Sequence, residues 1–337
     1  MKKILLTSGA ALMLSAGYAA ADVISFAGDA RMGVRYDNLQ DNEFSINSRI
    51  RGYFFFDAET DTGLEFGGRL RIDGAGLDAG GGTTASAAAN YVYVASEFGE
   101  VRVGDVPGAG LAAVGDLHGV GFTGLGFENE HAFFMRNFAN SPGATGGIFD
   151  TGGNAALYQY DLDAFSLYAH TGSIDDDNID TNVGIGASYD MGMFSVGAAF
   201  EYADVGGAVN YGGFDADGDP LDPDLVFADG DATHIVVGGD VNLDMFSVRG
   251  SFGRAGGDIA DFLPSRNQFG ASVEGSFDAY TLTAFAREDF FKDRHFGVGA
   301  SYDLGGGARI DGGVRHTRFD ADVDNQTQAD LGINMSF

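Results

Sequence analysis

Six arginines near the start of the chain have the residue type and spacing most suggestive of a chemical role. They form three pairs: Arg31 and Arg35, Arg49 and Arg51, and Arg69 and Arg71. Residues an even number of positions apart share one face of a β-strand. Neighbouring strands lie about 4.8 Å apart and same-face residues about 6.7 Å apart, so the six guanidinium groups can form one basic patch. Because like charges repel at this spacing, we expect water or opposing carboxylates around them.

The carboxylates that could oppose this patch lie in residues 104–154, the longest stretch without a strand pattern. They are Asp105, Asp116, Glu128, Glu130 and Asp150. A connection this long usually has a function or is disordered, and its many Gly and Phe residues indicate packing. We expect it to fold inward and to face the arginines with acids, a field that orients polar solutes. The alternative is a segment that caps the outside, with the arginines paired to Asp29, Glu65 and Asp73.

An acidic run in residues 203–231 is the candidate metal site. It contains Asp215, Asp217 and Asp219, and further aspartates follow. Carboxylate oxygens suit Ca²⁺, but the spacing is not that of an EF-hand, because Gly218 comes too early and Val226 stands where the closing Glu would be. A solvated acidic loop is the simpler interpretation. Calcium bridging such loops to lipid phosphates is the alternative hypothesis.

Other motifs predict no catalytic site. Residues 119–124 fit G-x-G-x-x-G, but they follow no βαβ unit, and such matches are expected by chance in a chain with 54 Gly. No G-x-S-x-G marks a nucleophile. The six histidines show no metal-ligand spacing and are expected to be polar residues of a lumen or of loops: His118, His131, His170, His234, His295 and His316.

Repeated amphipathic strands must position these residues. Residues 194–200, 280–284 and 331–337 each place an apolar residue at every second position. Period two puts the apolar set on one sheet face and the polar set on the other. The polar face carries too many charges for a dry core. We therefore predict an inverted barrel, with apolar side chains toward lipid and polar side chains toward water.

The connections alternate in length, which predicts the topology. Short turns are expected near 57–62, 96–99, 161–163, 190–193, 242–245, 277–279 and 303–307, and longer loops between them. Short turns on one side and long loops on the other are typical of an antiparallel up-and-down barrel in an outer membrane. Counting the segments predicts an all-β transmembrane barrel of about sixteen strands. Residues 22–337 are read as one domain.

The N-terminus and the composition set further bounds. Residues 1–21 have the charged start, short apolar run and Ala-rich end of a secretory signal, so the mature chain should begin at Asp22. No apolar run is long enough for a spanning helix. The chain has no Cys and only 5 Pro, which suits long hydrogen-bonded strands. A net charge of −30 argues against a nucleic-acid partner.

Several strings resemble the general-diffusion porins of photosynthetic and related alphaproteobacteria (the Rhodobacter type). They are residues 28–33, 62–67, 98–105 and 299–308, together with the terminal Phe337. The resemblance implies a sixteen-stranded homotrimer whose third external loop folds inward. It also implies an arginine wall, matched here by Arg31, Arg49, Arg51, Arg69 and Arg71, that faces loop acids. Family members also bind calcium, but the ligands do not map onto this chain.

We therefore expect a passive channel for small hydrophilic solutes and ions across the Gram-negative outer membrane. Its partners would be the lipid bilayer, lipopolysaccharide and two further copies of the chain. No enzymatic activity is expected, and no cofactor is required beyond possible calcium. The alternatives are a solute-selective channel or, from another class, an outer-membrane barrel enzyme or adhesin.

Overall fold

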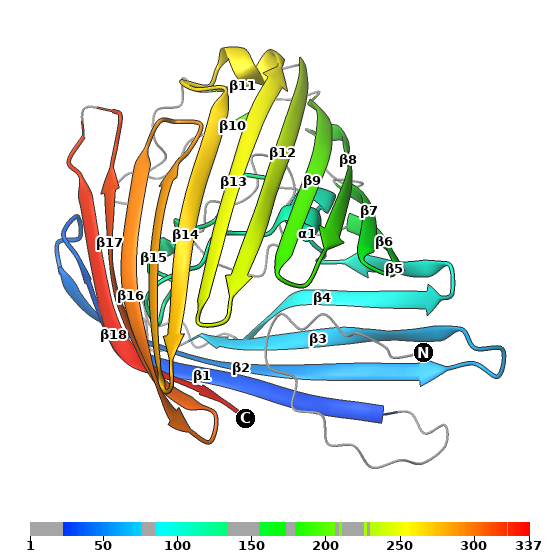
Figure 1. The fold of residues 1–337 in the computed structure, drawn as a ribbon, viewed down its shortest axis with the longest axis horizontal. Coiled ribbons are helices and arrows are strands. Elements are labelled where there is room, and N and C mark those ends of the chain that lie inside the picture. The colour runs from blue at the N-terminus through cyan, green and yellow to red at the C-terminus, as the bar shows by residue number, and fades with distance from the viewer. Residues whose placement is uncertain are drawn as a thin grey trace.

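A computed structural model describes residues 23–75, 85–133, 155–172, 179–205, 209–210, 226–227, 230–321 and 323–337. In these residues, sixteen antiparallel strands pair edge to edge and close into a barrel (Figure 1). Each barrel strand pairs with the barrel strands next to it in the chain, and the first strand pairs with the last. The predicted sixteen-stranded, up-and-down antiparallel barrel is confirmed.

The barrel strands follow the predicted segments closely. The first eight are β1 (Val23–Asp37), β2 (Phe44–Glu59), β3 (Glu65–Ala75), β4 (Ala85–Ser96), β5 (Gly99–Gly104), β6 (Ala155–Leu162), β7 (Phe165–Gly172) and β8 (Ile179–Asp190). The other eight are β9 (Phe194–Val205), β12 (Gly230–Leu243), β13 (Phe246–Gly257), β14 (Asn267–Phe277), β15 (Tyr280–Glu288), β16 (Arg294–Gly305), β17 (Ala308–Arg318) and β18 (Gln326–Ser336). A separate small sheet pairs β10 (Val209–Asn210) with β11 (Val226–Phe227).

Short turns join the strands at one end of the barrel, and longer connections join them at the other. Five of the short turns have only two residues, and three of these begin with an aspartate at positive φ: Asp163 at 51°, Asp244 at 43° and Asp278 at 52°. Tight hairpin turns that match the twist of the strands need this left-handed conformation, which Asp tolerates better than most residues. The acid that precedes an aromatic at these reversals therefore has a backbone role.

Pairing between β1 and β18 closes the cylinder. In its register, Arg31 lies opposite Asn334 and Met32 opposite Ile333. The ladder continues past the end of β18, where the Gly28 N–H donates to the Phe337 carbonyl at 2.6 Å and the Phe337 N–H donates to the Gly28 carbonyl at 3.0 Å. The terminal aromatic residue therefore belongs to the closing seam.

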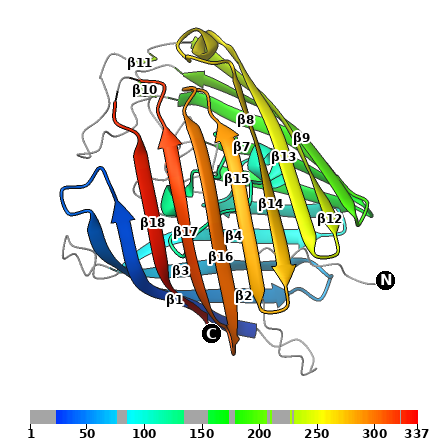
Figure 2. The same cartoon turned by 60° about the vertical axis from the view of Figure 1, so that its left-hand side comes forward.

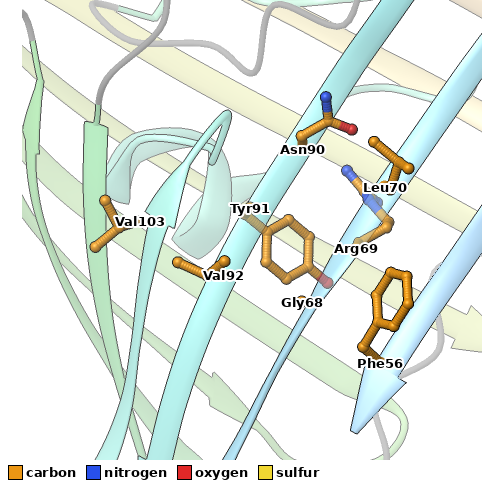
Figure 3. A pocket seen from close by; sticks show the side chains of 8 residues that line it. All are labelled: Phe56, Gly68, Arg69, Leu70, Asn90, Tyr91, Val92 and Val103. Atoms are coloured by element: carbon orange, nitrogen blue, oxygen red, sulfur yellow. The ribbon is translucent and has the colours of Figure 1, made fainter. Parts of the chain in front are cut away.

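The barrel is inside out, as the alternation predicted. On the outer face Phe26 is 70% exposed, Met32 53% and Val298 58%. Many charged and polar side chains on the opposite parity are buried, among them Arg315 at 1%. Leu70 has the outward parity but is only half-exposed. It lines a shallow pocket beside Gly68 and Val92, where β3 and β4 shift register between Arg69 and Arg71 (Figure 3).

The connection after β5 enters the barrel. Its described part, residues 105–133, is called the inward loop below, and it lies within the cylinder (Figures 1 and 2). The sequence predicted no regular structure here, but the loop forms two short helices, α1 (Ala109–Val114) and the 3-10 helix η1 (Leu125–Phe127). A further 3-10 turn, η2 (Asp258–Asp261), follows β13. Among the described residues, no helix combines the length and apolarity needed to cross a bilayer.

The core of the molecule lies between the inward loop and the barrel wall. Val106, Ala109 and Phe133 of the loop pack against the inward side chains Leu157 and Val236. The wall is thinned by glycine where α1 approaches. A Cβ added at Gly197 of β9 would lie 1.9 Å from the Ala113 carbonyl oxygen. Glycine at this position therefore lets the helix rest directly on the wall.

Candidate functional site

Four of the predicted arginines line the inner face of β2 and β3. Arg49 donates to Asp29 at 2.8 Å, and Arg51 donates to Asp73 at 3.1 Å. Arg71 donates to both oxygens of the same Asp73 carboxylate at 2.6 Å. Asp29 and Asp73 are two of the acids predicted above as alternative partners of the arginines. They hold the guanidinium groups of Arg49, Arg51 and Arg71 against the wall, because each binds a carboxylate of its own strand or of a neighbouring one.

Arg31 and Arg35 extend this patch onto β1. Arg31 donates from Nη1 to the backbone carbonyls of Phe122 and Thr123, at 3.4 and 3.3 Å. Its guanidinium group also lies 5.9 Å from the centre of the Phe122 ring. Arg35 donates to Asp37 at 3.3 Å. Arg31 is thus the predicted arginine at which the basic patch meets the inward loop.

The basic patch continues onto β4 and β5 and forms a basic wall, which is wider than the six arginines predicted from the sequence. The ring of Tyr91 lies between two guanidinium groups, with the Arg69 group 4.8 Å and the Arg102 group 5.6 Å from its centre. Figure 3 shows the Tyr91 ring beside Arg69. Arg102 also forms an ion pair with Glu100. The alternation of 91–94 and 100–103 was the available signal, because it gives Tyr91 and Arg102 the inward parity.

A bulge fixes this part of the wall. Asn90 accepts the Arg71 backbone N–H on its side-chain oxygen at 2.8 Å, where the β3–β4 register shifts. The Asn90 backbone carbonyl accepts the Asp105 N–H at 2.8 Å. Gly104, the residue before Asp105, has a φ of 129°. A Cβ at this position would lie 2.4 Å from the Asn90 carbonyl oxygen. The start of the inward loop is therefore tied to the residue next to Tyr91.

The predicted loop acid Glu128 binds a different set of cations. Its carboxylate lies 3.3 Å from Arg287, 3.3 Å from Arg315 and 3.2 Å from the ring of His295. These residues belong to β15, β17 and β16, and their side chains are almost fully buried. The Glu128 backbone carbonyl also accepts from Arg287 at 2.9 Å. Glu128 thus anchors the loop to the wall through a buried charge network.

The other predicted loop acids have structural contacts at the backbone or side chain. Asp116 accepts the His131 N–H on its carboxylate at 3.0 Å, and its backbone carbonyl accepts from Arg249. Asp105 begins the loop, and Glu130 follows η1, where its N–H donates to the Phe127 carbonyl at 2.9 Å. Asp105 and Glu130 are half-buried. Asp150, Asp215, Asp217 and Asp219 lie outside the described residues.

Buried polar bonds join the inward loop to the wall from β7 round to β18. Asp330 on β18 accepts the N–H of Phe122 at 3.2 Å and both the N–H and hydroxyl of Thr123, at 2.8 and 2.6 Å. On β14, the Ser272 hydroxyl accepts the His118 N–H at 3.0 Å. The helix α1 packs on β7, β8, β9 and β12. The loop therefore covers the side of the lumen away from the arginines of β2 and β3.

The described residues contain no group of three or more His, Asp or Glu arranged to hold a metal ion. His118, His131, His170, His234 and His295 instead form hydrogen bonds and ion pairs with the lumen wall and the loop. His316 is exposed on the outer face and bonds Thr327.

Comparison with known proteins agrees with this architecture. The family model for Gram-negative porins matches residues 8–322. The chain is 30% identical over 327 residues to a porin of Rhodobacter capsulatus, covering 93% of this chain and 100% of the relative. It is 27% identical over 326 residues to a porin of Fuscovulum blasticum, with the same coverage. A porin structure refined at 1.8 Å resolution superposes with a TM-score of 0.65 at 26% identity, covering 94% of this chain and 100% of that one.

Proposed function

Because this chain belongs to the Gram-negative porin family, it is an outer-membrane diffusion channel that crosses the membrane with many strands, and we propose that it is weakly selective. The solutes would be small, hydrophilic molecules and ions that diffuse through water. The observation that supports this is the polar lumen of a closed barrel, narrowed on one side by the inward loop. Selectivity would come from width and charge at this narrowing.

The basic wall would supply the charge filter. Arg49, Arg51, Arg69 and Arg71 would face the passage from β2 and β3, and Arg31 would join them to the loop. The loop acids would either face these arginines across the passage or fix the loop to the wall. They are Asp105, Asp116, Glu128 and Glu130. A polar solute would align its dipole between the two sides, whereas an apolar solute would lose hydration without gaining contacts.

The family indicates a channel rather than an enzyme, and we propose that the protein catalyses no reaction. Diffusion through water needs no nucleophile, general base or cofactor, and the polar residues described above already have structural partners. The proposed assembly is a homotrimer in contact with lipopolysaccharide. The apolar outer face of the barrel would supply its lipid and protomer contacts. We also propose that residues 1–21 are removed on export. Calcium is proposed to bind at Asp215, Asp217 and Asp219.

Recording currents in planar lipid bilayers tests the proposed function. The purified protein should give stepwise, ohmic conductance increases that vary with the bulk conductivity of the salt. The absence of steps would refute the channel function and favour an enzyme or adhesin. Saturable block by a single sugar or anion would instead indicate a solute-selective channel. Cross-linking in detergent should yield a trimer, and a monomer alone would refute that assembly.

A further inference from the structure

The start of α1 is held by a histidine whose bonding atom must be unprotonated. The backbone N–H of Ala109 donates to Nδ1 of His170 on β7 at 2.7 Å. Nε2 of the same ring lies 3.2 Å from Oδ1 of Asn182 on β8. A backbone N–H can only donate, so Nδ1 must accept, and the ring proton sits on Nε2, where it donates to Asn182. His170 is therefore neutral while it holds α1.

The returning limb of the inward loop is held by a second neutral histidine. Gln268 on β14 accepts the Ala132 N–H on Oε1 at 3.0 Å and donates from Nε2 to the Ala132 carbonyl at 2.7 Å. These two backbone groups fix which end of the amide is which. The same Nε2 lies 3.1 Å from Nε2 of His234 on β12, so that histidine nitrogen accepts. The His234 proton is then on Nδ1, which donates to Glu201 at 2.7 Å.

Both contacts are sealed from solvent. His234, Glu201 and Gln268 have no exposed surface, and His170 is 5% exposed. A ring that gained a proton here could not turn its new N–H toward water without disturbing the loop. Protonation of either histidine ring is therefore coupled to the position of the loop against the wall.

Glu201 on β9 is a titratable group in the same row of the sheet as both histidines. It accepts the hydrogen bond from His234 Nδ1, and only Gly184 of β8 stands between it and His170 in this row. The His234 ring also lies near two aromatic rings, with Phe133 of the loop at 6.2 Å and Phe290 at 5.8 Å between ring centres. His131 lies on the other side of the Phe133 ring. Glu201 supplies the counter-charge that an imidazolium in this site would require.

We propose that His170 and His234 are positioning residues that hold the inward loop while neutral and release it when they bind protons. A proton on His170 Nδ1 would point at the N–H of Ala109, and a proton on His234 Nε2 would point at the amide N–H of Gln268. Two buried donors that face each other lose their hydrogen bond and leave unsatisfied groups. Gln268 cannot flip to accept the new proton without losing its Oε1 bond to the Ala132 N–H.

The pH dependence of loop release follows from the number of protons that release binds. Because release of the loop binds protons, its equilibrium constant rises as the pH falls. Below about pH 6.5, where free histidine titrates, the constant should rise about tenfold per pH unit if one histidine controls release. It should rise about a hundredfold per unit if both must be protonated. The inference rests on the proposed function, in that a released loop enters the water-filled passage and lowers the current.

Glutamine variants test whether neutral His170 and His234 hold the inward loop, an arrangement called the latch below. In His170→Gln/His234→Gln, each side-chain amide can accept and donate like the neutral histidine but cannot titrate. His316→Gln is the matched control, because His316 is exposed on the outer face. Single-channel conductance in 1 M KCl should fall between pH 7.5 and 4.5 in the wild type and the control, and stay constant in the double variant. An unchanged acid transition in the double variant would overturn the proposal.

Cysteine labelling distinguishes failure of the latch from failure of the channel. The chain has no Cys, so Ala109→Cys introduces a unique thiol at a fully buried position. Labelling with a dipyridyl disulfide, which reacts at acid pH, should accelerate at least tenfold per pH unit below about pH 6.5, and should not accelerate when both histidines are glutamine. If the wild type forms no channel but labelling follows this pattern, only the proposed function fails. If channels form and labelling is independent of pH, the latch is wrong.

Discussion

Replacing four arginines with serine should make the channel more cation-selective, and the change should depend strongly on salt. The four residues are Arg49 and Arg51 of β2 and Arg69 and Arg71 of β3. They face two carboxylates, Asp29 and Asp73, to which three of them donate hydrogen bonds. Counting only these six groups, the net charge changes from +2 to −2, because four positive charges disappear and two acids remain. The variant wall should therefore attract the cations that the native wall repels.

The size of the effect follows from Coulomb's law with screening. A unit charge about 7 Å from an ion in water contributes about 0.6 kcal/mol, which screening at 0.1 M salt reduces to about 0.3 kcal/mol. Four charges then change the energy of a cation by about 1.2 kcal/mol, and that of an anion by the same amount with opposite sign. The cation-to-anion permeability ratio should rise tenfold or more at 0.1 M. At 1 M, where the Debye length is about 3 Å, it should rise only about twofold.

Reversal potentials in a salt gradient across a planar bilayer measure this ratio directly. Replacing the same four arginines with lysine is the matched control, because it keeps the charge and should leave the potential near that of the wild type. Arg266→Ser is a second control, since Arg266 pairs with Asp261 on an exposed connection. A reversal potential that does not change at 0.1 M would place these arginines away from the narrowest part of the passage. A shift that is equally large at 0.1 and 1 M would refute the electrostatic explanation.

Three further predictions concern single residues. Glu128→Gln removes the carboxylate from two buried arginines, and breaking such pairs costs about 3–5 kcal/mol, so we expect a less firmly held loop and more open-channel current noise; noise equal to that of the wild type would refute this. Tyr91→Leu removes two cation–π contacts of about 0.5–1 kcal/mol each, so the reversal potential should shift toward cations, whereas Tyr91→Phe should retain the wild-type value. Burial and the neighbouring Asp289 carboxylate raise the pKa of Asp293, on the β15–β16 connection, to about 6. Because the folded state keeps this proton between about pH 4 and 6, where the unfolded chain has lost it, Asp293→Asn should raise thermal stability more at pH 7 than at pH 4.

Strand positions could be predicted from the sequence because the barrel imposes one rule on each strand. Lipid on one side and water on the other require strict alternation, and this places Met32 outside and Arg31 inside without knowledge of any partner. The short turns were equally readable, since Asp163 and Asp278 mark reversals that need a left-handed residue. Parity alone also places Tyr91 and Arg102 on the inner face.

The contacts of the inward loop could not be predicted in the same way. The loop has no period, so nothing in the sequence relates Glu128 to Arg287, which is 159 residues away. The same holds for Gln268 and Ala132, separated by 136 residues. Arg287 and Gln268 are buried wall residues, and each meets its partner in the loop only once the barrel has closed. The sequence could therefore supply the acids and amides that hold the loop, but not the side of the lumen on which they meet.

The position of the loop and the charge of the passage are joined at one place in the wall. The backbone of Thr123 is held from two directions, since its N–H donates to Asp330 on β18 and its carbonyl accepts from Arg31 on the adjacent β1. A substitution of Arg31 therefore changes both the local charge and a contact of the loop. Arg49 is different, because it donates to the wall residue Asp29. Substituting Arg49 should change selectivity with little change in conductance, whereas substituting Arg31 should change both, so the two variants separate the charge of the filter from its width.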